Sequence, residues 1–373
     1  MRAALGHLPS LFWKRRPVHL TFFVTRRCNA RCPFCFYRRA LDAPDAAPEL
    51  SPEEVGRVAR SMDSLLWVLF SGGEPFLRED LVEVSALFHD LNRAAFLTYP
   101  TNGSLPEVVA DRTEEVLRRC PDSVVVVKLS LDGVGADHDA LRGVPGGFDR
   151  VMRTLERLAS LAGRQRRLEV GVNTLFCAEN QGRMDRIVDF VAGLDGVRSH
   201  TLTMARPVPG AEAPGEVDPD LYRGAGLRLE ARWRARRHRF AGAGLKSAQD
   251  RLQRRLVHRT LLERRRLVPC YAGRLGLVLS ESGDLYPCEG RWDAPLGNVR
   301  EAGYDVPGML RSARGRRALG ELERGACHCT NECNFLVNIL FNPRMHPGLL
   351  RDVAGLRPAW TGVEEAPRQA RAG

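Results

Sequence analysis

The sequence lacks a long hydrophobic run. Among its 373 residues the longest clear apolar stretch is residues 65–70 (LLWVLF), far short of the ~18 residues that a membrane-spanning helix needs. A secretory signal is missing too, because His7 and Pro9 interrupt the first apolar segment and the basic residues follow it. These absences predict a cytoplasmic protein.

Acidic residues are scarce in one region only. The chain has a formal net charge of +11, and residues 221–266 combine 14 arginines and Lys246 with three acids, so the rest is close to neutral. Two explanations of this segment are equally good. One is an arginine-rich helical face exposed to solvent, and the other is a surface that binds an anionic substrate or a nucleic acid or makes a peripheral membrane contact. Few aromatic residues are interleaved with these arginines, which disfavours RNA binding.

Ten cysteines form two groups and two singletons. The first group is Cys28, Cys32 and Cys35, with spacing C-x3-C-x2-C, whereas Cys120 and Cys177 stand alone and are expected to be small buried hydrophobic residues. Clustered cysteines in a cytoplasmic chain of this size indicate metal or redox chemistry rather than disulfides. The second group contains Cys270, Cys288, Cys327, Cys329 and Cys333.

Three thiolates at this spacing suit an iron–sulfur cube better than zinc. A structural zinc site is closed by four ligands, and no histidine is near the triplet. A four-iron cluster is saturated by four thiolates, so three leave one iron open for another ligand. A zinc knuckle or a reactive-thiol loop remains the alternative.

Strand-like and helix-like segments alternate over the first 206 residues. The pattern predicts an α/β fold, a partial (β/α)6 TIM-type barrel of parallel strands whose ligand-binding loops follow the carboxyl ends of the strands. We expect the six strands at residues 18–25, 66–70, 95–99, 123–131, 168–176 and 197–204.

Polar residues gather where these strands end. The cysteine triplet follows the first strand, and a Ser-Gly-Gly-Glu-Pro sequence at residues 71–75 follows the second. Either motif alone would be weak, but together at neighbouring strand ends they indicate a ligand site. Further candidates on the same rim are residues 101–103 (TNG), Ser130, Asp132 and Asn173.

The carboxyl-terminal third does not continue the strand and helix alternation. A basic, helical linker at 207–266 is expected to lead into a small β-hairpin and helix domain at 267–345, after which residues 346–373 form a poorly ordered tail. The hairpin delivers Cys270 and Cys288 from its opposite ends. The five cysteines of this region suffice for one four-thiolate cluster, and a structural zinc site is again the alternative.

The triplet in CNARCPFC, the SGGEP motif and the SLDG stretch at residues 130–133 together resemble the radical SAM superfamily over residues 18–206, after a short extension at 1–17. The resemblance implies a 4Fe–4S cluster whose open iron binds S-adenosylmethionine. One electron then cleaves this molecule to a 5′-deoxyadenosyl radical, which abstracts a substrate hydrogen.

Matched position by position, the resemblance implies roles for individual residues. Cys28, Cys32 and Cys35 bind the cluster, with Phe34 as their aromatic neighbour. The remaining positions are implied to contact S-adenosylmethionine: Gly72, Gly73, Glu74 and Pro75 at its amino group, and Ser130, Asn173 and Arg142 at its ribose or carboxylate.

Residues 270–333 resemble a SPASM or Twitch extension, although the full seven-cysteine set of SPASM domains is absent. This implies one auxiliary 4Fe–4S cluster. Its expected ligands are Cys270, Cys288 and Cys333, with Cys329 ahead of Cys327 as the fourth.

The expected function is oxidation or rearrangement of a substrate C–H site, of the peptide-maturation type, with an electron donor of the flavodoxin or ferredoxin type as partner. The same chemistry on a sugar, lipid or other small anionic metabolite is the alternative. A non-catalytic, cysteine-metal RNA-binding protein is the alternative of another class. No general base can be named, and Asp132 and Glu289 are only carboxylates at suitable places.

Overall fold

The computed structural model describes residues 6–41, 47–205, 215–233, 240, 242–325, 327–356 and 360. Most of the 207–216 boundary and part of the arginine-rich segment, residues 234–239 and 241, lie outside these ranges.

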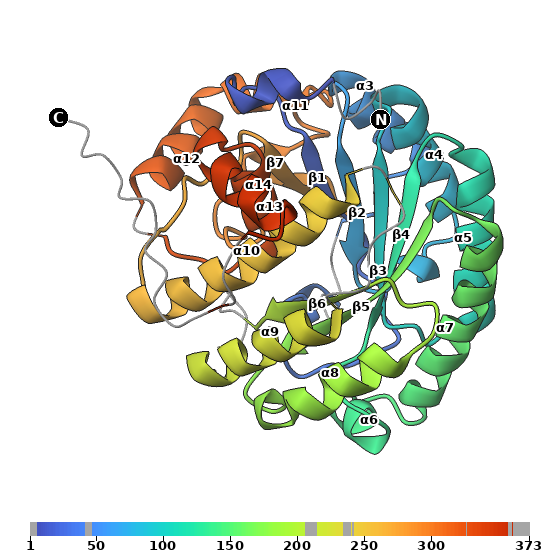
Figure 1. Cartoon of the computed structure of the whole chain (residues 1–373). Helices are drawn as coiled ribbons and strands as arrows, with labels where there is room; N and C mark the ends of the chain where they lie inside the picture. The colour runs from blue at the N-terminus through green and yellow to red at the C-terminus, as the bar shows by residue number, and fades with distance from the viewer. Residues whose placement is uncertain are drawn as a thin grey trace.

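Six parallel strands form the wall of a partial barrel, as the sequence predicted (Figure 1). Each strand pairs with the next along the chain, in the order β6-β5-β4-β3-β2-β1, so every connection returns over the outside of the sheet. The strands are β1 (His19–Thr25), β2 (Trp67–Gly72), β3 (Phe96–Thr101), β4 (Val124–Ser130), β5 (Leu168–Phe176) and β6 (Ser199–Met204).

Amphipathic helices cover the outer face of this wall. Their capping follows the sequence: Ser51 and Glu54 form a reciprocal capping box at the start of α3, with Pro52 at its first position. The helices of the barrel are α2 (Arg38–Leu41), α3 (Pro52–Ser61), α4 (Leu81–Asn92), α5 (Pro106–Arg119), α6 (Ala136–Arg142), α7 (Gly147–Arg164) and α8 (Met184–Gly193).

The two faces of the strands differ in burial. In β3, β4 and β6, every second residue is buried in the core beneath the helices, whereas the alternate residues, which face the barrel lumen, are only half-buried. Val127 and Leu129 illustrate the outer face, and Lys128 and Ser130 the inner one. Side chains therefore do not fill the lumen.

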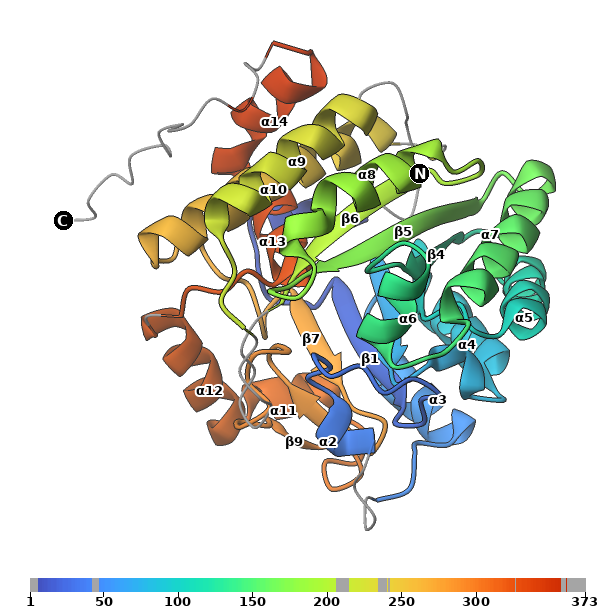
Figure 2. The ribbon, with the colours of Figure 1, turned by 90° about the horizontal axis from the view of Figure 1, so that it is seen from below.

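The carboxyl-terminal hairpin does not form a separate sheet. Strand β7 (Gly276–Leu279) pairs in parallel with β1, and β8 (Asp284–Tyr286) and β9 (Gly297–Asn298) extend the sheet beyond it. Figure 2 shows β7 beside β1, with α11 (Val306–Arg311) and α12 (Ala313–Arg324) on its far side. One continuous sheet thus positions the first cysteine group, which follows β1, and also Cys270 and Cys288, which flank β7 and β8.

Within its described residues, the arginine-rich segment forms internal ion pairs. It contains α9 (Pro219–Trp233) and α10 (Ala243–Glu263). Arg254 and Arg255 are buried, each 3.5 Å from a carboxylate oxygen of Glu230, and Nε of Arg228 lies 2.8 Å from Oδ1 of Asp189. Much of this positive charge is therefore neutralised inside the protein, which favours the structural explanation over an anion-binding face.

The expectation of a poorly ordered tail from residue 346 is wrong for its first part. Residues His346–Val353 form helix α14, which follows α13 (Glu332–Leu340) and packs on α10, where Nε of Arg251 lies 2.9 Å from Oδ2 of Asp352. The apolar residues of this short helix, such as Leu349, bury against the core and fix it. Residues 357–359 and 361–373 lie outside the described ranges. No helix in the part of the chain that the structure describes is both long and apolar enough to cross a bilayer.

Candidate active site

The first cysteine group lies in the loop that leaves the carboxyl end of β1, as the sequence predicted. The backbone N–H of Ala30 donates to Sγ of Cys28 at 3.4 Å, and Cys32 is 8% exposed. Burial raises the pKa of all three thiols, to about 11 for Cys35. Three thiols held in one loop at the rim of an open lumen suit a cluster with one free iron, and its assembly there would release their protons.

Gly72 and Gly73 press against the backbone that enters this loop. A Cβ added to Gly72 would lie 2.3 Å from the carbonyl oxygen of Thr25, and one at Gly73 would lie 2.1 Å from that of Arg27. The backbone N–H groups of Gly73 and Glu74 donate to these same carbonyls at 2.7 and 2.8 Å. The glycines therefore hold the second motif against the first, a role that the sequence did not reveal.

We expect Gly73→Ala to destabilise the fold and displace the cysteine loop. The new methyl group must push the backbone at Arg27 away, at a cost of about 1–3 kcal/mol, the usual range for overpacking. Urea unfolding and iron content after anaerobic reconstitution both report this effect. The matched control is Gly163→Ala in α7, where nothing lies within 4 Å of the added Cβ. A G73A protein as stable as G163A would contradict the packing argument.

Glu74 is a buried carboxylate surrounded by donors. Its Oε1 accepts from Oγ1 of Thr101 at 2.8 Å and from the N–H of Phe76 at 3.2 Å, and its Oε2 accepts from the N–H of Asn102 at 2.7 Å. Burial raises its pKa to about 7 despite these bonds. Glu74 thereby joins the end of β2 to the loop after β3.

The same rim collects the other predicted polar residues. Nδ2 of Asn102 donates to Oδ1 of Asn29 in the cysteine loop at 2.7 Å. Ser130 and Asn173 are direct partners in the register of β4 and β5, and Oδ1 of Asn173 accepts from Oγ1 of Thr203 at 2.6 Å. The structure thus brings Ser130 and Asn173 together at the carboxyl edge of the barrel.

Arg142 lies beneath the cysteine loop and pairs with Asp132. Its Nε lies 2.7 Å from Oδ2 of Asp132, whose other oxygen accepts from the N–H of Leu175 at 2.7 Å. The guanidinium also lies 5.8 Å from the ring centroid of Phe34, and its positive charge lowers the pKa of Cys32 against the larger, opposite effect of burial. With both oxygens engaged and no exposed side-chain surface, Asp132 is a structural anchor rather than a free base.

The second cysteine group converges from three segments. Cys270 and Cys288 flank the β7–β8 hairpin, and the charges of Cys270 and Cys329 both raise the pKa of Cys288, whose burial brings it to about 12. A hydrogen bond with Cys329 lowers the pKa of Cys327 to about 7. No three His, Cys, Asp or Glu side chains in the described ranges already form a single-ion site.

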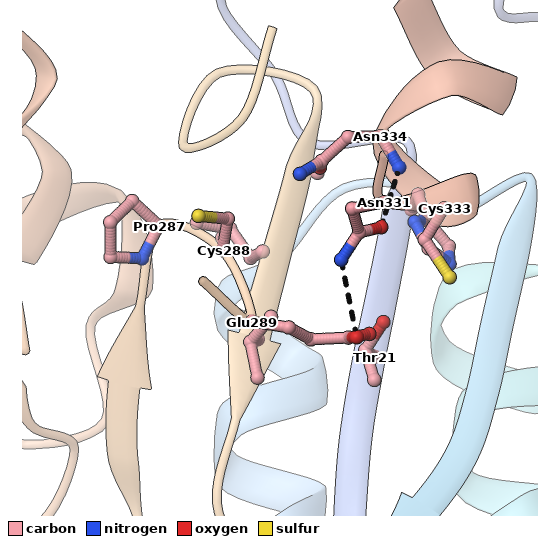
Figure 3. A pocket seen from close by; sticks show the side chains of 11 residues that line it. Thr21, Pro287, Cys288, Glu289, Asn331, Cys333 and Asn334 are labelled. Carbon is pink, nitrogen blue, oxygen red and sulfur yellow. Dashed lines mark hydrogen bonds between the residues drawn. The ribbon is translucent and has the colours of Figure 1, made fainter. Parts of the chain in front are cut away.

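A small pocket separates Cys333 from Cys288 (Figure 3). Glu289 is 7% exposed, and its Oε2 accepts from Nδ2 of Asn331 at 3.2 Å, between the two cysteines. The thiols of Cys288 and Cys333 point away from each other in this view. The pocket also contains His19 and Thr21 of β1, so it connects the second cysteine group with the lumen side of the barrel.

Two supporting residues escaped the sequence analysis. Arg78 is 3% exposed and donates to the carbonyl oxygens of Val24 and Leu50 at 2.6 Å, which fixes the end of β1. Asn29 ties the cysteine loop to the loop after β3. Arg78 belongs to no motif, and Asn29 is an unassigned position within CNARCPFC. Only their hydrogen bonds in three dimensions identify these roles. Cys120 and Cys177 are buried, as predicted.

A parallel barrel with a three-cysteine loop after its first strand and a Gly-Gly-Glu-Pro turn after its second defines a class of cofactor-dependent enzymes. Residues 22–191 match the family model described as the Radical SAM superfamily. Residues 22–191 thus carry a radical SAM domain, and proteins of that superfamily use a 4Fe–4S cluster and S-adenosylmethionine as cofactors.

Similarity to individual proteins extends the match. The chain is 35% identical over 153 residues to "Fe-coproporphyrin III synthase" of Methanosarcina barkeri, covering 40% of this chain and 36% of that protein. It is 25% identical over 307 residues to "AdoMet-dependent heme synthase" of Nitratidesulfovibrio vulgaris, covering 75% and 76%. The structure "Native anSMEcpe with bound AdoMet and Cp18Cys peptide" superposes with a TM-score of 0.56 at 16% identity, covering 91% and 100%.

The chain spans between about a third and just over half of the length of the first curated relatives that it matches, 36%, 38% and 56%. The structural likeness, at 16% identity, shows a shared fold alone.

Proposed function

We propose that this enzyme uses S-adenosylmethionine to activate a C–H bond of a substrate held in the barrel lumen, and oxidises or rearranges it. The observation that carries the proposal is the placement of Cys28, Cys32 and Cys35 at the carboxyl end of β1, against the turn that follows β2. When bound there, the cluster and S-adenosylmethionine supply a 5′-deoxyadenosyl radical that abstracts hydrogen from the substrate.

The chain's own residues orient and shield this chemistry. The three thiolates hold the cluster, and the turn at Gly72, Gly73 and Pro75, fixed by Glu74, offers backbone groups to the amino end of S-adenosylmethionine. The polar pair of Ser130 and Asn173 faces the lumen at the same edge, in reach of its ribose or carboxylate. In this arrangement Arg142 acts under the loop, on Asp132 and Cys32, instead of on S-adenosylmethionine.

The comparisons bear on the substrate class. The sequence predicts peptide maturation, with a sugar, lipid or other small anionic metabolite as the alternative. The relative that aligns over three quarters of both chains is named a heme synthase, and this favours the small anionic metabolite. A carboxylated porphyrin is the first compound to test, and a peptide is the second. The basic segment adds little support for an RNA partner, because several of its described arginines, such as Arg254 and Arg255, form ion pairs within the protein.

An auxiliary cluster in the carboxyl-terminal region is part of the proposal. Cys270, Cys288 and Cys329 are within electrostatic reach of one another, and Cys327 joins them through its hydrogen bond with Cys329. Cys333 lies across the pocket from Cys288. Because Cys327 interacts with Cys329 and Cys333 lies apart, we favour Cys327 over Cys333 as the remaining ligand of the cluster.

We expect about eight irons per chain after anaerobic reconstitution, and about four in a Cys270→Ala, Cys288→Ala double variant. Iron and sulfide analysis with electron paramagnetic resonance of the reduced protein measures both values. Cys333→Ala and Cys327→Ala, compared side by side, identify the fourth ligand by which variant loses the second cluster. An unchanged iron content in the double variant would show that this region holds no cluster.

The experiment that tests the function is an anaerobic assay of 5′-deoxyadenosine release with dithionite, or with flavodoxin or ferredoxin as electron donor. Carboxylated iron porphyrins and candidate peptides are compared as substrates, and mass spectrometry follows the changed compound. If porphyrins or peptides stimulate the release of 5′-deoxyadenosine and also change in mass, that class of compound contains the substrate. No release of 5′-deoxyadenosine from cluster-loaded protein would overturn the proposal.

A further inference from the structure

Lysine is rare in this chain, and one lysine lies inside the barrel. Among 56 basic residues only Lys14, Lys128 and Lys246 are lysines. Of the lumen-facing positions of β2 to β6, all within described residues, only Lys128 and Glu169 carry a charge. A cation in a protein interior that otherwise uses arginine calls for a specific explanation.

The side chain of Lys128 crosses β5 to reach β6. Its Nζ donates to Oγ of Ser199 at 2.5 Å and to Oγ1 of Thr201 at 3.2 Å. The row across the sheet is Lys128, Gly171 and Ser199, which are register partners in turn. A Cβ at Gly171 would lie 2.7 Å from Nζ of Lys128 and 2.5 Å from Oγ of Ser199, so the path across β5 requires glycine.

The ammonium has hydroxyl partners, and among the described residues no carboxylate forms an ion pair with it within 4 Å, although Glu169 and Asp250 lie close enough to act on it electrostatically. It has three N–H donors, of which the two hydroxyls accept two. Nearby charges come from Glu169 on β5 and from Lys246 and Asp250 on α10, which pair with each other, and the buried His200 of β6 is neutral. Burial lowers the pKa of Lys128 to about 8, so the group is still a cation at pH 7.

The position of this cation relative to the rim sets what it can reach. Ser130 and Asn173 form the next row toward the carboxyl edge, two residues along each strand, or about 6–7 Å. Lys128, Ser199 and Thr201 are each half-buried, so they are accessible from the lumen. A ligand in the lumen one row below Ser130 and Asn173 would therefore be within reach of the ammonium.

We propose that Lys128, Ser199 and Thr201 form an anion subsite in the barrel lumen that binds a carboxylate group of the substrate. The proposal rests on the proposed function only in taking the lumen as the place where the substrate binds. A single cation flanked by hydroxyls matches a monoanion such as a carboxylate, whereas a phosphate dianion would lack a second positive partner. A bound carboxylate places a negative charge beside the partly desolvated ammonium of Lys128, and this attraction is the driving force for binding.

The test is a titration of the three lysines by nuclear magnetic resonance. Cluster-loaded enzyme is labelled with 13C at the lysine Cε, which gives three signals, and Lys128→Met, Lys14→Met and Lys246→Met assign them. The pH titration is run in sodium chloride, then in sodium propionate and in propionamide with chloride at matched ionic strength. We expect propionate to raise the titration midpoint of Lys128 by about one pH unit, which corresponds to a tenfold preference of the anion for the protonated form.

The controls are within the same spectra. The signals of Lys14 and Lys246 should not respond, and the neutral propionamide, which has the same shape, should leave all three unchanged. If Lys128→Met does not fold, the two other variants still assign the third signal by elimination. A midpoint of Lys128 that is equal in chloride, propionate and propionamide, or an equal shift of all three lysines, would overturn the subsite.

This result is independent of catalysis. The titration needs neither S-adenosylmethionine cleavage nor an identified substrate, so a shift in an inactive protein would keep the subsite and remove the proposed function, and the reverse outcome would do the opposite. With a carboxylated substrate in hand, we expect Lys128→Met to raise KM about tenfold or more. The rise in KM should diminish as the pH of the comparison rises above 8, because the wild-type ammonium is then lost too.

Discussion

Replacing Cys32 with alanine is expected to abolish reductive cleavage of S-adenosylmethionine. Cys32 is the middle thiol of the triplet, and a cube with two protein thiolates loses the arrangement that leaves a single open iron. Reconstituted Cys32→Ala should therefore contain about four irons fewer than the wild type and release no 5′-deoxyadenosine above background with dithionite. Iron analysis and chromatography of the nucleoside measure the two effects separately.

Cys120→Ala is the matched control for this loss. Cys120 is also buried, but it belongs to neither group and lies at the end of α5, away from the loop. Its replacement removes a buried thiol and should leave iron content and cleavage intact. If Cys32→Ala kept the iron content and cleavage rate of Cys120→Ala, the cluster assignment would be wrong.

The barrel could be predicted from sequence because its signals are local. The strand Val124–Ser130 begins with four consecutive β-branched valines, and the helix Pro52–Ser61 begins with a capping serine and a proline. The parallel order of β1 to β6 then follows from the alternation of strand and helix. The rim residues could be found because they lie near the carboxyl ends of their strands.

Non-local pairing could not be predicted in this way. Strand β7 has only four residues, and nothing in them indicates that it pairs with β1, more than 250 residues earlier in the chain. The sequence therefore predicts the hairpin but not that its strands extend the barrel sheet. The net charge of the arginine-rich segment could not predict its ion pairs for the same reason. A count of charges includes Arg254 and Arg255 but does not show that both lie beside Glu230.

Gly72 and Gly73 of the Ser-Gly-Gly-Glu-Pro motif have a structural role that the sequence did not predict. The sequence suggested that Gly72 and Gly73 let a ligand approach the backbone. In the structure they allow close contact with the carbonyls of Thr25 and Arg27. Packing against the cysteine loop is thus a sufficient reason for both glycines, and any contact with S-adenosylmethionine is additional to it.

Arg142→Ala should have the largest effect on stability of any single change considered. The Asp132 side chain has no exposed surface, and that of Arg142 is 13% exposed. Removing the guanidinium leaves a buried carboxylate with only the N–H of Leu175, and breaking such a pair costs about 3–5 kcal/mol. The variant should also take up less iron, since the positive charge of Arg142 favours the thiolate form of Cys32. Urea unfolding measures the first effect, and iron analysis the second.

The charge of Asp132, rather than the lost volume of Arg142, should be the main cause of this effect. Adding Asp132→Asn to Arg142→Ala removes the unpaired charge, so the double variant should be more stable than Arg142→Ala alone. Arg157→Ala is the exposed control: its partner Glu107 is 63% exposed, and loss of that pair should change stability by at most about 1 kcal/mol. A double variant no more stable than Arg142→Ala would instead attribute the effect to packing against Phe34 and the cysteine loop, with the Asp132 pair only incidental to the fold.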